Sequence, residues 1–180
     1  MTAVPSINLN EVARDAYERG YIPIVVEGKK PFVPKWEQTT RDKALERVSK
    51  SASRGTGIGI LTGPVGGVVD IVVVDIDTTN YGVETWDWLV RKWGLPDTTQ
   101  VRTPSGGRHI YFLIDERTKD ITNTVRIGGR GIDVRGIGGQ VVYPGSPNYA
   151  WISQSPPTVM PDWIFSLLWR HQNKIKIEEE

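Results

Sequence analysis

The chain of 180 residues contains no cysteine. This absence excludes disulfide bonds, cysteine-based zinc sites and thiol chemistry together, and it is compatible with a cytoplasmic location. A strong charge of one sign is also lacking, because the formal net charge is only +1. The protein therefore has no global basic field, and any contact with nucleic acid has to come from a local basic patch.

Long apolar runs are absent as well. No stretch is long enough to span a membrane, and the N-terminus lacks the charged-then-apolar pattern of a signal peptide. We therefore expect no membrane partner. The length fits one domain with a sizeable core, and we expect a single domain over residues 1–180, with its core at about 16–150 and a C-terminal helix at about 160–174.

The sequence does contain clear signals for both helices and strands. Apolar residues at helical spacing behind capping residues predict helices at about 9–19, 40–53, 81–93 and 162–174. β-branched and aromatic runs between glycine and proline turns predict strands at about 21–26, 57–61, 71–76, 99–103, 108–114, 131–135, 140–144 and 149–152. In the third helix, the buried stripe is expected to contain Trp86, Leu89, Val90 and Trp93.

One short run, residues 72–77, organises the rest of the chain. Its β-branched residues are typical of a strand covered on both faces, and Asp75 and Asp77 are two residues apart, so a strand aims both carboxylates to the same side. Such a pair repels itself unless a cation or a proton intervenes, and Mg²⁺ or Mn²⁺ is the usual cation at an all-oxygen site near phosphate. The alternative is a strand that simply runs out into the polar turn at 77–80.

Two further motifs carry chemistry. In Ser105-Gly106-Gly107-Arg108-His109, the glycines let the backbone come close to a ligand, and the last two residues open a strand beside it. A short strand ends at Asp133, which is followed by Arg135 and a glycine turn. With Asp75 and Asp77, these residues predict a site for a divalent metal and a triphosphate, because metals neutralise phosphate charge, arginine donates two hydrogen bonds to phosphate, and histidine can donate one.

Each motif also has an ordinary explanation. Asp133 alone could be a turn residue that pairs with Arg135, His109 a satisfied core or surface histidine, and Ser105 part of a plain hairpin. Surface charge is the simple explanation of the arginines, Arg102, Arg108, Arg126 and Arg130. The basic residues of the second helix form either a solvated face or the flank of a nucleic-acid groove. The joint case is stronger than its parts, because all three motifs lie at strand–turn junctions.

The glycine-rich turn at 62–67 is not a phosphate-binding P-loop. It lacks the Gly-Lys-Ser/Thr ending, and it leads into a strand rather than a helix. The phosphate contacts of the expected site therefore have to come from elsewhere in the chain.

The ordered motifs resemble those of the archaeo-eukaryotic primase superfamily and, more narrowly, the bifunctional primase–polymerase N-terminal domain of phage and plasmid replication proteins. The segments Tyr21-Ile-Pro-Ile, Gly28-Lys-Lys-Pro, Trp36 and Gly57-Ile-Gly-Ile-Leu-Thr-Gly also match that domain, and the resemblance covers about residues 16–147. It implies an α+β fold: an RRM-like core with a mixed or antiparallel sheet, a second small α/β unit, flanking helices, and an active site between the two units.

The resemblance also implies roles for individual residues. Asp75, Asp77 and Asp133 would be the catalytic carboxylates that hold Mg²⁺ or Mn²⁺, as two ions, and His109 would contact the phosphates of the incoming nucleotide. The remaining residues expected near the nucleotide are Ser105, Gly106, Arg108, Arg135 and Lys30. No zinc site of the cysteine type can form, although some relatives carry a zinc-binding stem.

The implied reaction is template-directed nucleotidyl transfer with dNTPs or NTPs on a single-stranded DNA template and primer. Its setting would be phage or plasmid replication in the cytoplasm of a bacterial or archaeal host. The chain stops soon after the core, which indicates a domain excised from a longer helicase–primase with a C-terminal helical or helicase region as its partner. Two alternatives stay open: a two-metal phosphodiesterase or nuclease, and a non-catalytic nucleic-acid-binding module.

Overall fold

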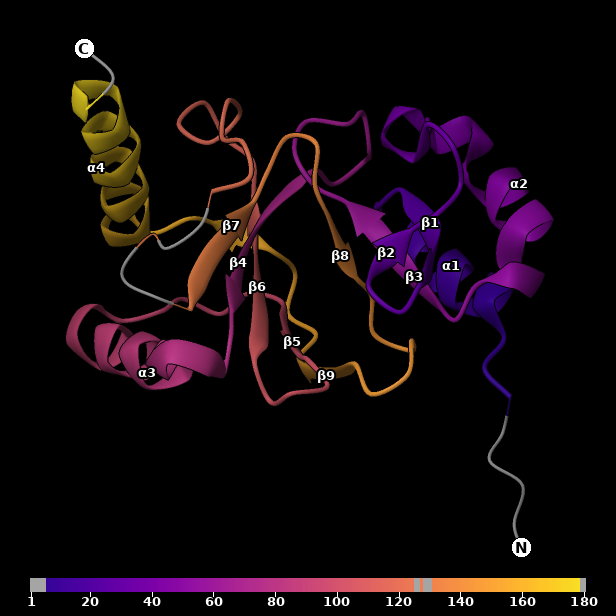
Figure 1. The fold of residues 1–180 in the computed structure, drawn as a ribbon, viewed down its shortest axis with the longest axis horizontal. Helices are drawn as coiled ribbons and strands as arrows, with labels where there is room; N and C mark the ends of the chain where they lie inside the picture. The colour runs from indigo at the N-terminus through magenta and orange to yellow at the C-terminus, as the bar shows by residue number, and fades with distance from the viewer. Residues whose placement is uncertain (1–5, 125–126, 128–130, 179–180) are drawn as a thin grey trace, which may run out of the picture.

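Two sheets, each covered by a pair of helices, make up the structure (Figure 1). The computed structural model describes residues 6–124, 127 and 131–178, and Arg126 and Arg130 lie outside this part. The helices in the described residues are α1 (Leu9–Glu18), α2 (Arg41–Ser51), α3 (Gly82–Trp93) and α4 (Asp162–Glu178), with short 3-10 turns at Trp36–Gln38, Ala52–Arg54 and Thr79–Tyr81.

The strands are mainly antiparallel. The small sheet has the order β2-β1-β3-β8 and contains β1 (Pro23–Glu27), β2 (Lys30–Pro31), β3 (Gly57–Leu61) and β8 (Gln140–Val142). The large sheet has the order β7-β4-β6-β5-β9 and contains β4 (Ile71–Ile76), β5 (Gln100–Arg102), β6 (Arg108–Leu113), β7 (Ile132–Arg135) and β9 (Ala150–Ser153). A short parallel strand, β10 (Thr158–Val159), adds to β6. This architecture confirms the expected α+β class with a second small unit.

The large sheet follows the RRM-type order of strands and helices with one change. The strands β4, β5, β6 and β7, with α3 after β4, follow the order of a β-α-β-β-α-β unit except at the position of its second helix. The described residues between β6 and β7 form no α-helix, and α4 supplies the second helix from the end of the chain. Both helices pack on one face of the sheet, where the rings of Trp86 and Trp163 lie 5.6 Å apart.

Local sequence signals explain where α1 begins and ends. The Asn8 side chain accepts hydrogen bonds from the backbone N–H groups of Asn10 and Glu11, at 3.1 and 3.3 Å, which caps the start of the helix. The chain leaves the helix through Gly20, whose φ is +101°. A side chain at position 20 would also collide with Val69, so glycine is needed there for two reasons.

The core between the two sheets is apolar and aromatic. One buried cluster joins α1, the small sheet and the inner face of the large sheet, and its rings include Tyr21, Tyr111 and Tyr143. Tyr21 lies edge-on to both other tyrosines, with ring centroids 5.9 and 6.2 Å apart. Each fully buried aliphatic or aromatic side chain in this layer stabilises the fold by roughly 1.5–3 kcal/mol. The two sheets are therefore held by a shared core.

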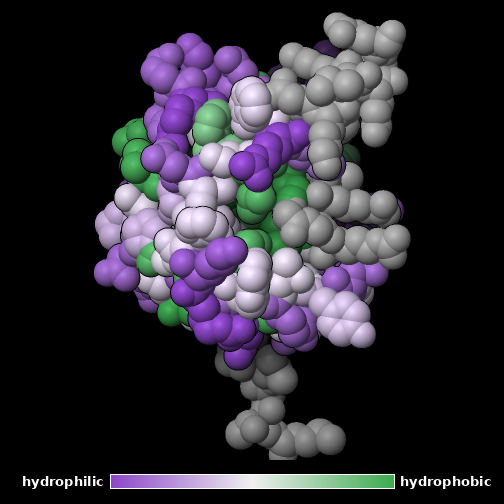
Figure 2. All heavy atoms as spheres, turned by 90° about the vertical axis from the view of Figure 1, so that its left-hand side faces the viewer, coloured by the Kyte–Doolittle hydropathy of each residue, from purple (hydrophilic) through white to green (hydrophobic). Residues whose placement is uncertain are grey.

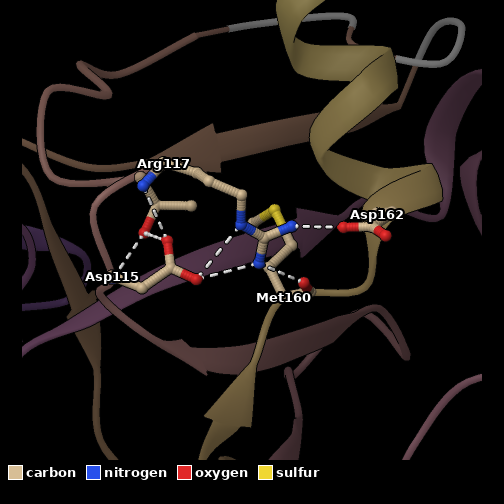
Figure 3. Close-up of polar contacts among 5 residues, drawn as sticks. Asp115, Arg117, Met160 and Asp162 are labelled. Atoms are coloured by element: carbon tan, nitrogen blue, oxygen red, sulfur yellow. Dashed lines mark hydrogen bonds and ion pairs between the residues drawn. The ribbon is translucent and has the colours of Figure 1, made fainter.

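An arginine network fixes the start of α4 (Figure 3). The guanidinium of Arg117 donates to the carboxylate of Asp115 at 2.9 Å, to the carbonyl oxygen of Met160 at 2.6 Å and to the carboxylate of Asp162 at 2.7 Å. Burial alone would raise the pKa of Asp115, but its hydrogen bonds with Arg117 outweigh this and lower the pKa. These contacts therefore connect the segment after β6 to α4, the helix that packs on the large sheet.

Two details of the helices differ from the sequence predictions. Trp86 and Leu89 of α3 are buried as expected, but Trp93 is 57% exposed. The prediction for Trp93 was wrong because α3 reaches the edge of its covered face there, and Gly94 ends the helix immediately afterwards. The last helix continues to Glu178, beyond the predicted end at about residue 174.

The side of the molecule that carries α3 and α4 has a mixed surface. Figure 2 shows apolar residues near the centre of this face, with polar and charged residues around them. In the described residues, no helix is both long and apolar enough to cross a membrane.

Candidate active site

The register of the large sheet brings three of the predicted residues into one row. Asp75 on β4 is the partner of Asp133 on β7 and, on its other side, of His109 on β6. Directly paired residues of antiparallel strands project to the same face of a sheet. The row Asp133–Asp75–His109 therefore faces the small sheet, although Asp133 lies inside β7 rather than at its end.

A cavity of about 280 Å³ opens in front of this row, between the two sheets. The large sheet and its turns contribute Asp75, Ile76, Asp77, Thr103, Ser105, His109, Asp133 and Arg135. The other wall comes from Lys29 in the turn between β1 and β2, from β8 with Gln140, Val141 and Val142, and from Tyr149. Most of the lining side chains are therefore polar or charged, and charges of both signs are present.

Asp75 is the electrostatic centre of the cavity. Its Oδ1 lies 3.5 Å from Nε2 of His109, and its Oδ2 accepts a hydrogen bond from Nη2 of Arg135 at 3.4 Å. Burial acts to raise the pKa of Asp75, but His109 and Arg135 together outweigh burial and hold that pKa below its usual value. The carboxylate is therefore kept ionised, as a ligand for a cation has to be.

Two polar atoms of the cavity residues have no hydrogen-bond partner. They are Nδ1 of His109, whose side chain is only 8% exposed, and Oε1 of Gln140, and both atoms are buried among the described residues. The amide nitrogen of Gln140 is used, because it donates to the carbonyl oxygen of Lys29 at 3.0 Å. Buried groups without partners are rare and costly, and they are expected where a ligand supplies the missing bond.

Tight backbone packing fixes the turns that carry Asp77 and Ser105. The backbone N–H of Asp77 donates to the carbonyl oxygen of Gly131 at 2.8 Å, and its Oδ1 accepts from the N–H of Thr79 at 3.2 Å. A Cβ atom at Gly107 would collide with the carbonyl oxygen of Ile76, so only glycine allows the 103–107 turn to lie against the end of β4. This approach brings the Ser105 turn to the cavity.

Three residues expected at the nucleotide site lie elsewhere. Arg108 and His109 are adjacent on β6, so their side chains point to opposite faces of the sheet. The guanidinium of Arg108 pairs with Asp87 of α3 at 2.8 Å, on the helix-covered face. Lys30 lies on β2 outside the cavity lining, whereas its neighbour Lys29 belongs to it. Gly106 lines a separate groove next to the cavity, together with Ser105.

Sequence reasoning also missed four residues that line the cavity with polar side chains, Lys29, Thr103, Gln140 and Tyr149. The pair of lysines in the turn at 28–31 pointed to the right segment, but only the fold decides which lysine faces inward. Gln140 and Tyr149 belong to no motif. They line the cavity because β8 and the segment before β9 lie beside it in the fold.

The basic residues of α2 serve the structure of their own unit. The guanidinium of Arg41 donates to the carbonyl oxygens of Tyr17 and Tyr21, at 2.9 and 3.1 Å. Arg47 donates to the carbonyl oxygen of Pro34 at 2.8 Å, and Lys50 pairs with Glu46 at 3.0 Å. These contacts favour the simple explanation over the flank of a nucleic-acid groove.

The carboxylates suit a hard divalent cation in their chemistry, because all three offer oxygen ligands to one cavity. They are not drawn together into a ready cluster: within the described residues, no three histidine, cysteine, aspartate or glutamate side chains converge enough to hold a metal ion. Asp75 is instead engaged by His109 and Arg135. The residue types therefore fit a hard divalent metal.

Comparison with known proteins identifies the family of the chain. No curated protein matches the chain significantly. The sequence does match the family Prim-Pol, described as bifunctional DNA primase/polymerase, N-terminal, over residues 13–163. That match covers most of the chain, and it spans both sheets and every residue that lines the cavity. The chain therefore belongs to the family of N-terminal domains of bifunctional DNA primase/polymerases.

Proposed function

We propose that this domain catalyses template-directed nucleotidyl transfer, with a nucleoside triphosphate bound in the cavity between the sheets. The observation that carries the proposal is the row Asp133–Asp75–His109, with Asp77 beside it and two cationic side chains, Lys29 and Arg135, at the same cavity. Acidic groups for a metal and basic groups for phosphates meet in one space, as phosphoryl and nucleotidyl transfer require.

The carboxylates of Asp75, Asp77 and Asp133 would hold Mg²⁺ or Mn²⁺. When bound, such ions lower the pKa of an attacking hydroxyl and neutralise the charge of the leaving pyrophosphate. Asp75 is suited to this role because its pKa lies below its usual value, so that it is ionised at neutral pH. A proposed pair of ions is supported by the number of carboxylates around the cavity.

The cationic and neutral donors would hold the triphosphate. Arg135, whose Nη2 lies 3.4 Å from a carboxylate oxygen of Asp75, can offer the other hydrogen-bond donors of its guanidinium to phosphate oxygens. Lys29 adds a mobile point charge, and the unpartnered Nδ1 of His109 offers a buried hydrogen-bonding group. Ser105 and Thr103, whose hydroxyl oxygens lie 3.4 Å apart, add neutral donors at the edge.

Primer extension tests the proposal. A labelled primer on a single-stranded DNA template is incubated with the protein, Mg²⁺ or Mn²⁺, and dNTPs or NTPs in separate reactions. We expect products longer than the primer, and we expect them to vanish in the Asp75→Asn/Asp133→Asn double variant. Shortening of the primer would instead identify a nuclease, and no change in any reaction would contradict catalysis by this domain.

The wider setting is also part of the proposal. Phage or plasmid replication, work on single-stranded DNA in the cytoplasm, and a C-terminal helical or helicase partner are supported by the motif resemblance. The cavity, with a volume of about 280 Å³, offers space for the triphosphate of an incoming nucleotide.

A further inference from the structure

Two more hollows adjoin the cavity, and Tyr149 lines all three spaces. The first, here named the apolar hollow, has a volume of about 190 Å³ and shares Lys29, Val142 and Tyr149 with the cavity. Its other walls are Gly28, Thr56, Gly57, Pro104, Ser146 and Pro147. The second, named the outer groove, has about 430 Å³ and runs past Arg102, Gly106, Asn148 and Ala150.

The cavity and the apolar hollow differ in charge, as the two ends of a nucleotide do. The cavity is lined by carboxylates, a guanidinium and an imidazole. Apart from Lys29 at the shared edge, the described residues that line the apolar hollow are uncharged. A nucleoside triphosphate carries its charge at one end and a flat ring with apolar faces at the other. Phosphates therefore match the cavity, and a base matches the adjoining hollow.

The walls of the apolar hollow are held in place by hydrogen bonds. The N–H of Gly28 donates to the Thr56 hydroxyl at 2.7 Å, which fixes the turn between β1 and β2 to the start of β3. The Ser146 hydroxyl accepts from the N–H of Ile58 at 2.9 Å, which fixes the opposite wall. The hollow is therefore built before any ligand arrives, and pre-formed sites lose less entropy on binding.

Tyr149 stands at the boundary as a fixed aromatic wall. Its ring is tilted by 33° against the imidazole of His109, with centroids 6.1 Å apart, and it packs against two buried core clusters. A half-buried aromatic ring is the usual platform on which proteins stack a base.

We propose that the apolar hollow is the subsite for the base of the incoming nucleotide and that Tyr149 is the positioning residue on which this base stacks. The inference rests on the proposed function, because it assigns the triphosphate to the cavity. It places the base in the apolar hollow, which Pro147 also lines, rather than in the outer groove.

Calorimetric titration with two ligands tests the inference separately from the proposed function. In the presence of Mn²⁺, a dNTP probes cavity and hollow together, whereas inorganic tripolyphosphate probes the cavity alone. We expect Tyr149→Leu, which keeps apolar bulk but removes the ring, to weaken dNTP binding by about tenfold and to leave tripolyphosphate binding within twofold. Tyr149→Phe is the matched control, and it should bind both ligands as the unmodified protein does.

A second pair of variants tests which side of the ring is used. Pro147→Trp adds bulk to the apolar hollow, and Ala150→Trp adds similar bulk to the outer groove. We expect weaker dNTP binding, with unchanged tripolyphosphate binding, only in the first variant. Equal dNTP affinity in Tyr149→Leu and the unmodified protein, or loss in Ala150→Trp alone, would overturn the base subsite and leave the triphosphate site standing. If neither ligand bound the unmodified protein, both proposals would fall.

Discussion

The two faces of the large sheet are made by the same strands but differ sharply in character. On β4, the side chains of Val72 and Val74 are buried beneath α3 and α4, whereas Val73 and Asp75 face the small sheet. One residue further along β4, the paired residues change from the polar row Asp133–Asp75–His109 to the row Ile132–Ile76–Arg108. The side chains of this second row belong to the other face. Neighbouring residues in the sequence therefore have unrelated tasks.

The difference shows how the fold supports a cluster of charges. One face is a dry core with two helices on it, and it fixes the backbone of β4, β6 and β7. The other face presents carboxylates to the cavity, and Asp75 among them pairs with Arg135 and His109. Substitutions on the helix-covered face should therefore change stability, and substitutions on the cavity face should change chemistry.

The largest effect is expected for Asp75→Asn. This change keeps the size of the side chain but removes the charge that would hold a metal, and we expect primer extension to fall by at least about a hundredfold. Asp87→Asn is the control, because Asp87 is the acidic partner of Arg108 on the opposite face. It should extend primers at nearly the unmodified rate.

The melting temperature sharpens this test. Because the pKa of Asp75 is lowered in the folded state, its ionised form adds stability above the pKa of the unfolded chain, and this contribution disappears as pH falls through the folded pKa. Asp75→Asn should therefore melt slightly lower at neutral pH and like the unmodified protein in acid. Full primer extension by a folded Asp75→Asn variant would refute the assignment of the cavity face.

The next effect concerns the helix-covered face. Ile110 follows His109 on β6 but is fully buried in the cluster beneath α3 and α4. We expect Ile110→Ala to lower the free energy of unfolding by about 2–5 kcal/mol, measured by urea denaturation, with primer extension preserved in the protein that stays folded. His109→Gln should do the reverse, with a small change in stability and a raised KM for nucleotide. Equal stability losses in both would contradict the division of the two faces.

The layer between the sheets predicts a sensitivity to alkali. Burial raises the pKa of Tyr21 to about 12, and it raises the pKa values of Tyr111 and Tyr143 as well. Tyrosines with raised folded pKa values contribute stability that is complete below about pH 10, the ordinary tyrosine pKa, and that is lost as pH rises through the folded values. The free energy of unfolding should fall steeply above about pH 10, and Tyr21→Phe should reduce that slope. A slope unchanged by this substitution would mean that Tyr21 is not the responsible group.

Much of the fold could be predicted from the sequence because its signals are local. Asn8 and Gly20 mark the two ends of α1, and the expected strands that contain Asp75, His109 and Asp133 all form. The strand expected at about 21–26 begins at Pro23 in the structure, as β1. The pairing of these strands into one row is a tertiary property: the position of the motifs at strand–turn junctions predicted that the residues meet, but not which strands pair.

The parts of the site that could not be predicted depend on side-chain direction and on distant segments. The motif Ser105–His109 suggested that Arg108 and His109 act together, but alternation along β6 sends them to opposite faces. The turn at 28–31 offered two lysines, and only the hairpin geometry selects Lys29. Tyr149 reaches the cavity from beyond the last motif, so no local pattern pointed to it.

The smallest effect is expected for Arg108→Gln. The guanidinium of Arg108 pairs with Asp87 on the helix-covered face, where the two side chains are 30% and 40% exposed, so solvent screens the pair and its loss should cost less than about 1 kcal/mol of stability. Because the side chain points away from the cavity, the KM for nucleotide should change by less than about twofold, whereas Arg135→Gln should raise it about tenfold through a lost charged hydrogen bond to phosphate. Steady-state primer extension over a range of nucleotide concentrations separates the two variants. A large rise in KM for Arg108→Gln would show that Arg108 leaves Asp87 to contact the nucleotide, and the two faces of the sheet would then not be independent.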